Sequence, residues 1–204
     1  MVTDSQTLAE RALALTAARG IARARDFQAA GIPLAYLRRL CEAGRLLRLG
    51  RGLYQIPELA GTDASHSLAE AARLFPNGIV SLVSALRYHG LTTQLPHAVW
   101  LTIPQKARTP KTADLPLEIV RASGPALSAG VEHVEIERVE VPIYKAAKTV
   151  ADCFKYRRRV GADVAVEALR DALRLRQATP AELMRYAAID RVANIMRPYL
   201  EALA

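Results

Sequence analysis

The sequence predicts an α+β fold, and its periodicity and composition support this class. Near both ends of the chain apolar residues recur at helical spacing, whereas between about 98 and 143 they alternate or form short apolar runs, as strands do. The chain has 204 residues, of which 51% are hydrophobic, and this is enough for one core or two small ones. The order of helices, strands and helices therefore indicates a short sheet flanked by helices.

The first 57 residues are expected to form three helices and a hairpin. Gly31-Ile32-Pro33 breaks the chain, and Pro33 suits the first turn of a new helix because its missing N–H needs no partner there. Gly50-Arg51-Gly52 separates two short β-prone runs and is typical of a hairpin turn. The expected elements are helices over about 8–18, 25–30 and 33–43 and strands over 46–49 and 53–56. This succession predicts a winged helix-turn-helix domain over residues 1–57.

The second part of the chain, residues 64–204, is expected to fold as one α+β domain after a turn-rich linker at 57–63. Capping boxes, which start helices, are expected at 67–70 and 179–182. The expected elements are helices over about 67–75, 81–89, 145–159, 164–176, 180–187 and 191–203 and strands over 98–103, 117–121, 131–136 and 139–143. One domain is preferred to two because four short strands alone would expose too much apolar surface.

The chain carries an excess of positive charge. It has 28 Lys and Arg against 20 Asp and Glu, a net charge of +8, and 23 of the 28 basic residues are arginine. The excess is uneven, since residues 1–57 and 144–204 each carry +5 whereas residues 58–143 carry −2. Because the planar guanidinium grips phosphates and base edges bidentately, a polyanion is the first partner to consider.

The helix expected over 33–43 has an apolar and a basic side. At 100° per residue, the apolar side consists of Leu34, Leu37, Leu40 and Cys41, and the opposite side of Ala35, Arg38, Arg39 and Glu42. A helix of this kind can enter the major groove of DNA. There Arg38 or Arg39 would donate a fork to guanine O6 and N7, and Ala35 would touch a thymine methyl group.

The basic residues that follow this helix are expected to hold the DNA backbone. Arg45 and Arg48 are interpreted as phosphate contacts that set the register. Arg51, at the hairpin tip, would reach the minor groove or the backbone, and the neighbouring glycines permit close approach. The alternatives are a helical corner with solvated arginines and a winged helix that docks to protein. The agreement of helix, turn, helix, wing and basic face favours double-stranded DNA.

The helix expected over 145–159 combines a buried stripe with a positively charged end. Its stripe consists of Ala147, Val150, Ala151 and Phe154, and its end carries Lys155, Arg157, Arg158 and Arg159. This cluster could hold nucleic acid, the phosphates of a nucleotide or an acidic protein surface. The interpretation favoured here is that the cations complement the negative helix end. Asp152 faces away from the stripe and is expected to pair with a cation, Arg87 being one candidate.

Two histidines have alternative interpretations. His89 shares the apolar face of its helix, which favours a hydrogen-bonded core side chain over a catalytic one. His133, Glu135 and Glu137 would share one strand face, which on paper gives a metal site. An exposed strand face needs no metal, so no metal ligand is assigned. The other two histidines, His66 and His97, are expected in caps or loops.

Other functional classes lack their sequence signals. Cys41 and Cys153 lie far apart, without a C-x-x-C motif and on apolar helix faces, so neither a disulfide scaffold nor a zinc site is expected, which suits the cytoplasm. No secretory signal or membrane span is expected from the apolar runs. No lysine follows an acidic residue by two positions, as a metal-carboxylate nuclease would require. The common nucleotide, hydrolase and metalloprotease motifs are missing too, so no catalytic residue and no cofactor are expected.

Four short motifs carry a resemblance to a known family. They are Gly31-Ile32-Pro33, Arg51-Gly52-Leu53-Tyr54, residues 84–91 (SALRYHGL) and residues 149–157 (TVADCFKYR). In this order they resemble the AbiEi-type antitoxins of bacterial type IV toxin-antitoxin systems, from about residue 5 to the C-terminus. The resemblance implies an N-terminal winged helix that represses the toxin-antitoxin operon at inverted repeats and a C-terminal domain needed for antitoxicity. It also implies a nucleotidyltransferase-like toxin as partner and a role in phage defence.

Carried over residue by residue, the resemblance gives Arg38, Arg39 and Arg51 a role in DNA binding and places residues 152–159 in the functional C-terminal domain. The resulting hypothesis is a non-enzymatic antitoxin and repressor. One rival is a stand-alone winged-helix regulator whose second domain senses a small molecule. A second rival is an enzyme, either a kinase-like modifier of the toxin or a metal hydrolase.

Overall fold

The computed structural model describes residues 7–50, 52–61, 65–109 and 115–203, and the statements below concern these residues. They fall into two compact units. Unit 1 runs to Pro76 and includes Leu115 and Glu135–Glu140, and unit 2 comprises the rest. This division follows Pro76, whereas the sequence pattern placed a linker at 57–63. A separate domain over residues 1–57, with a second over 64–204, stays a prediction.

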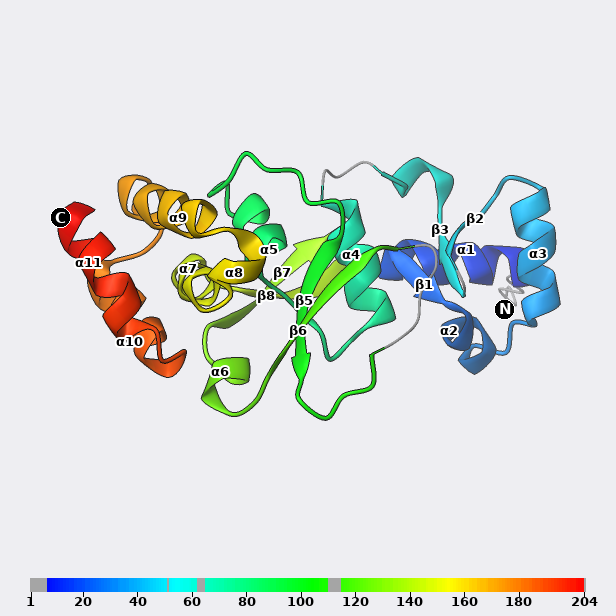
Figure 1. Ribbon diagram of the computed structural model, residues 1–204. Helices are drawn as coiled ribbons and strands as arrows, with labels where there is room; N and C mark the ends of the chain where they lie inside the picture. Colours follow the sequence, from blue (N-terminus) through cyan, green and yellow to red (C-terminus); the bar gives the residue numbers. More distant parts are fainter. Residues whose placement is uncertain (1–6, 51, 62–64, 110–114, 204) are drawn as a thin grey trace, which may run out of the picture. The chain divides into compact units, whose positions relative to one another are not determined.

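Unit 1 begins with three helices and a small sheet (Figure 1). Its elements are α1 (Leu8–Arg19), β1 (Ile21–Arg23), α2 (Ala24–Ala29), α3 (Leu34–Glu42), β2 (Leu47–Gly50), β3 (Leu53–Gln55), the 3-10 helix η1 (Pro57–Leu59) and α4 (His66–Leu74). The strand order is β1-β3-β2, and β3 is antiparallel to both neighbours. This is the succession of a winged helix-turn-helix, with β2 and β3 as the wing.

Local sequence explains most of these elements. Thr7 and Glu10 cap α1 reciprocally, with the Thr7 N–H donating to Glu10 at 2.8 Å and the Glu10 N–H to the Thr7 hydroxyl at 3.2 Å. Apolar side chains from the helices and the wing form the core of the unit; its fully buried members include Ala12, Phe27, Ile32, Leu37 and Leu46. Strand β1 was not predicted, because three residues are too short to show a period of two.

The capping box predicted at 67–70 is wrong. Helix α4 begins at His66, so Ser67 lies inside the helix, and its N-cap Ser65 makes no side-chain capping bond. The helix starts one residue earlier than the pattern indicates, at His66, whose side chain contacts Glu137. The second box is confirmed: Thr179 caps α10 and accepts from the Glu182 N–H at 3.2 Å.

Unit 2 contains most of a five-stranded mixed sheet and the C-terminal helices. Its elements are β4 (Ile79–Val80), α5 (Leu82–Tyr88), β5 (Val99–Pro104), β6 (Leu117–Ala122), α6 (Pro125–Ser128), β7 (Val131–Ile136), β8 (Val139–Tyr144), α7 (Ala146–Lys155), α8 (Arg157–Val160), α9 (Ala162–Arg174), α10 (Pro180–Ile189) and α11 (Ala193–Leu203). The strand order is β6-β5-β4-β8-β7, with β5 parallel to β6 and β4 parallel to β8. The predicted α+β class is confirmed.

Helix α7 is the centre of unit 2. It packs against α5, α9, α10 and α11, and every residue from Ala146 to Phe154 is buried. The four positions predicted for its buried stripe are all confirmed. The helix ends at Lys155 rather than 159, because Tyr156 leaves the helical conformation and a separate turn, α8, follows. Within the described ranges, no helix has the length and apolar character needed to cross a membrane.

Candidate nucleic-acid interface and charged cluster

Helix α3 presents a basic, solvent-facing surface. Leu37 and Leu40 are buried at 0% and 4% exposure, whereas Ala35, Arg38 and Arg39 are exposed. Leucines at i and i+3 anchor the helix and thereby fix which way the arginines point. For residues 37–40, in the middle of α3, the sequence pattern therefore predicted the buried and exposed faces correctly.

At the start of α3 the prediction for Leu34 is wrong. The pattern placed this side chain on the buried face, but it is 41% exposed. Leu34 is the first residue of the helix, and side chains on a helix lean toward its N-terminus. Its side chain therefore extends past the end of the helix, and the apolar period places it incorrectly.

Arg38 and Arg39 differ in their partners. The Arg38 Nε donates to Glu42 Oε1 at 2.8 Å, with 83% and 61% of the two side chains exposed. An exposed i,i+4 pair contributes only about 0.3–0.5 kcal/mol, so a phosphate or a base edge can replace Glu42 at little cost. Arg39 is exposed and makes no side-chain bond to the described part of the chain. Both guanidinium groups are thus available to a ligand.

The phosphate-contact candidates lie next to α3. Arg45 and Arg48 are exposed, and the Arg48 Nε donates to the Gly50 carbonyl at 3.3 Å within the wing. Arg51 lies outside the described residues, so its predicted place at the wing tip stays a prediction. Arg25, which sequence reasoning did not single out, is also exposed and lies on α2.

Other arginines of unit 1 hold the scaffold together instead. Arg11 donates to the Ala30 carbonyl at 2.6 Å, and Arg23 to the Leu74 carbonyl at 2.8 Å. Asp26 pairs with Arg19 at 2.5 Å and with Arg73 at 3.1 Å. Burial pushes the pKa of Asp26 upward, but the bond from the Arg23 N–H and the two arginines outweigh it and lower that pKa. By contrast, Arg38 and Arg48 bond to nearby residues of their own segments, Glu42 and Gly50.

The segment Glu135–Glu140 completes unit 1 through a buried polar contact. Glu137 accepts from the Gln55 side chain at 2.7 Å and contacts His66 Nδ1 at 2.8 Å. It lies in the turn after β7 with a left-handed φ of 50°. Glu137 therefore does not share a strand face with His133 and Glu135, as the metal hypothesis required. No group of three metal-binding side chains occurs among the residues described.

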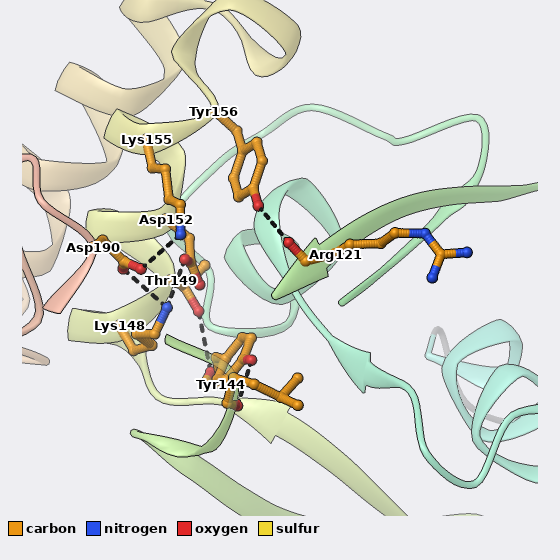
Figure 2. Close-up of polar contacts among 9 residues, drawn as sticks. Arg121, Tyr144, Lys148, Thr149, Asp152, Lys155, Tyr156 and Asp190 are labelled. Atoms are coloured by element: carbon orange, nitrogen blue, oxygen red, sulfur yellow. Dashed lines mark hydrogen bonds and ion pairs between the residues drawn. The ribbon is translucent and has the colours of Figure 1, made fainter. Parts of the chain in front are cut away.

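Unit 2 contains a buried cluster of four charged side chains, which Figure 2 shows in close-up. Lys148 Nζ lies 2.6 Å from Asp152 Oδ1 and 2.9 Å from Asp190 Oδ2, and Lys155 Nζ lies 3.2 Å from Asp190 Oδ1. The side chains of Lys148 and Asp190 are fully buried, and that of Lys155 is 30% exposed. Burial raises the pKa of Asp152 to about 7, against the pull of Lys148.

The expectation that Asp152 pairs with a cation holds, but the partner is Lys148 and not Arg87. Lys148 precedes Asp152 by one helical turn, so both lie on the same side of α7. The i,i+4 spacing could have revealed this pair. Asp190 directly follows α10, 42 residues away from Lys148, and no local signal links the two.

The basic residues at the end of α7 and in α8 differ in their partners. Lys155 pairs with Asp190, Arg157 donates to the Phe154 carbonyl at 2.9 Å, and Arg159 pairs with Glu118 at 2.5 Å. Arg158 is exposed. The Arg157 bond to a carbonyl of the last helical turn agrees with the favoured interpretation that cations complement this helix end.

His89 has the predicted structural role. Its Nε2 lies 2.7 Å from the Tyr144 carbonyl, and 12% of its side chain is exposed. The side chain therefore joins the end of α5 to the end of β8.

Comparisons with known proteins found a family model that matches the N-terminal part and a solved structure with a similar fold. The family model for "Transcriptional regulator, AbiEi antitoxin" matches residues 10–57, and it is the family that the sequence motifs resemble. The crystal structure of the RV2827C protein from Mycobacterium tuberculosis is similar with a TM-score of 0.58 and 17% identity, over 97% of this chain and 80% of that chain. At this identity the likeness shows a shared fold. No curated protein matches the chain.

Proposed function

We propose that this chain, whose residues 10–57 match the AbiEi antitoxin transcriptional regulators, is a cytoplasmic antitoxin that represses its own operon by binding operator DNA. We further propose that residues 64–204 neutralise a nucleotidyltransferase-like toxin. The family match supports a regulator or antitoxin role, and we assign the chain no catalytic residue and no cofactor.

The exposed basic face of α3 carries the DNA-binding proposal. Arg38 and Arg39 project from a helix that Leu37 and Leu40 anchor, and Ala35 leaves room for close approach. In our proposal α3 enters the major groove, where one guanidinium forks onto guanine and Ala35 touches a thymine methyl group. Arg45 and Arg48 bind phosphates and set the register, and Arg51 adds a contact from the wing.

The antitoxin part of the proposal uses the exposed cations after α7. Asp152 is buried, and the side chain of Lys155 is only 30% exposed and pairs with Asp190, so we assign neither residue to the toxin contact. Arg158 and Arg159, which are exposed, are the candidates for an acidic toxin surface. The family match supports this part only through its antitoxin description.

Two experiments test the proposal. The first titrates the full chain into DNA from upstream of its own operon and into a scrambled duplex of equal length. We expect operator affinity at least about 1000 times higher than scrambled affinity at physiological salt. Equal affinity for both duplexes contradicts the operator proposal.

The second experiment co-expresses the chain with the product of the adjacent reading frame. Wild type and the Arg38→Ala/Arg39→Ala variant are both expected to protect cells, because the proposed toxin contact lies elsewhere. The Arg158→Glu/Arg159→Glu variant is expected to bind operator but fail to protect. Protection by that charge-reversed variant excludes Arg158 and Arg159 as the toxin-binding residues.

A second candidate function is a stand-alone regulator whose C-terminal domain senses a small molecule. One observation favours it: unit 2 has a cavity of about 570 Å³ with charged walls. This candidate predicts operator binding that changes with a small ligand, and no toxin gene next door.

A further inference from the structure

The cavity of unit 2 lies where two parallel strands end. Gln105 directly follows β5 and Ser123 directly follows β6, and both line the cavity. Crevices outside the carboxyl ends of parallel strands are common ligand sites in α/β sheets. The volume of about 570 Å³ falls within the range of about 300–1,000 Å³ typical of small-molecule sites.

The remaining walls come from β6, α6 and the helices of the C-terminal part. They are formed by Arg121, Ala122, Pro125, Ala126, Lys155, Ile189, Asp190 and Arg191. Three of these residues are basic and one is acidic. The walls of the cavity therefore carry a positive charge.

The acidic residue does not offset this charge. The Asp190 carboxylate accepts from Lys155, which lines the cavity, and from the fully buried Lys148. Two ammonium groups thus share one carboxylate. The second carboxylate of the cluster, Asp152, leaves Oδ2 buried without a hydrogen-bond partner in the described part of the chain, and burial favours its neutral form. An anion at Lys155 would balance the cluster.

Arg121 shapes the cavity but is not free to bind a ligand. Its guanidinium donates to the carbonyls of Gln105 and Ala107, at 2.9 Å and 2.7 Å, and to the Thr109 hydroxyl at 2.7 Å. Figure 2 shows this side chain directed away from the Lys148 cluster. Arg121 therefore fixes the loop after β5, which forms one wall.

Arg191 is the free cation of this site. It is exposed, and within the ranges that the structure describes its guanidinium makes no bond. Its backbone has a left-handed φ of 59°, an uncommon conformation for a residue other than glycine. This conformation ends α10, where the Val192 N–H donates to the Ala187 carbonyl at 2.8 Å. Arg191 directly follows Asp190, and both residues line the cavity.

We propose that this cavity binds a phosphorylated small molecule, whose phosphate oxygens are held by Lys155 and Arg191 and by the hydroxyl of Ser123. Lysine supplies a point charge and arginine a bidentate fork, the usual pair of phosphate ligands. The proposal bears on the second candidate function and gives its ligand a chemical class. It is independent of operator binding, because it needs neither DNA nor a toxin.

The test is calorimetric titration of the full chain with inorganic pyrophosphate and with ATP at constant ionic strength. Concentrations up to about 10 mM detect dissociation constants to about 1 mM. We expect saturable binding of at least one probe. Tighter binding of ATP assigns the site to a nucleotide, and equal binding assigns it to the phosphates alone.

A pair of matched variants locates the binding. Arg191→Gly removes the guanidinium and relieves the left-handed backbone, so the fold is retained, and we expect at least about tenfold weaker binding. Arg176→Gly is the control: Arg176 is also exposed, has a φ of 56° and does not line the cavity. The Arg176→Gly variant should bind pyrophosphate and ATP with the same affinity as the wild type.

Three results overturn the proposal. One is the lack of saturable binding of both probes. Another is equal binding by the Arg191→Gly and Arg176→Gly variants. The third is loss of binding in Arg38→Ala/Arg39→Ala, which would place the anion on α3 instead. None of these results affects the operator proposal, which the DNA titration tests separately.

Discussion

The ammonium of Lys148 donates a 2.6 Å hydrogen bond to Asp152, and the two side chains are only 0% and 5% exposed. Buried charges are costly to desolvate, and their mutual attraction compensates only when the geometry is good. Lys148 meets this condition because it also bonds Asp190. The cluster joins α7 to the end of α10, and two of its members, Lys155 and Asp190, line the cavity.

Replacing Lys148 by Met should destabilise unit 2 strongly. The substitution leaves two buried carboxylates without their shared cation, and removing one partner of a buried pair costs about 3–5 kcal/mol. Urea unfolding followed by the fluorescence of Trp100 measures this, since Trp100 is the single tryptophan and lies in β5.

The control for this prediction is Lys145→Met, the same chemical change at the exposed N-cap of α7. Its effect should stay within about 0.5 kcal/mol. Equal unfolding midpoints for Lys148→Met and wild type would show that the cluster contributes nothing to stability.

The stability of unit 2 should fall as the pH rises from about 4 to about 7. Burial raises the pKa of Asp152 to about 7, whereas an unfolded Asp loses its proton near pH 4. Across this window the folded state binds more protons than the unfolded state, so stability decreases with pH, by at most about 1.4 kcal/mol per unit. The charged groups that act on Asp152 in the folded state are Lys148 and Asp190.

Asp152→Asn isolates this contribution. The amide oxygen still accepts from Lys148 but cannot ionise, so the variant should lose less stability than wild type between about pH 4 and pH 7. Urea midpoints taken at steps of about one pH unit give both profiles. Parallel profiles would mean that Asp152 is ionised in the folded state throughout.

Local patterns predicted the elements that carry the proposed DNA surface. The two faces of α3 follow from a period of about 3.6 residues over one helix, so Leu37, Leu40, Arg38 and Arg39 could be assigned from the sequence. Strands β7 and β8 were found because six residues are enough to show alternation. At the start of a helix the apolar period does not predict burial, because no preceding helical turn lies beside the side chain. Leu34, the first residue of α3, is an example.

Contacts between distant segments could not be predicted in this way. Asp190 meets Lys148 across 42 residues, and Glu137 meets Gln55 across 82. A helical or strand period says nothing about which element packs beside which. This is why the sequence suggested Arg87 as the partner of Asp152 and did not reveal the contacts of Glu137 with Gln55 and His66.

The Arg38→Ala/Arg39→Ala variant should have both weaker operator affinity and weaker sequence preference. Removing an arginine that reads a base edge costs about 1–3 kcal/mol, and a gel-shift series on operator and mismatched duplexes measures both effects. Arg48→Ala should weaken binding to all sequences alike and reduce the salt slope by about 1.

The matched control for these variants is Arg197→Ala, which removes one exposed positive charge from α11. It should leave operator affinity and salt slope unchanged. Unchanged operator affinity in the double variant would instead exclude α3 as the reading helix.

Gly20→Ala should unfold unit 1 locally, whereas Gly31→Ala should have a mild effect. Both glycines have a positive φ, of 64° and 71°, so both substitutions carry a similar backbone cost of about 1–2 kcal/mol. A Cβ on Gly20 would overlap the Glu137 carbonyl oxygen, whereas a Cβ on Gly31 meets nothing within 4 Å. The excess cost of Gly20→Ala is therefore the steric cost of packing Glu135–Glu140 against the end of α1.

Hydrogen exchange of the backbone amides of α1 and β1 distinguishes the effects of the two substitutions. Protection should fall much further in Gly20→Ala, because the backbone of Glu137 must move and its side chain must then leave Gln55 and His66. Operator affinity should fall with it, since α3 packs on the same core. Equally reduced protection in both variants would mean that segment 135–140 adds nothing to the stability of the DNA-binding unit.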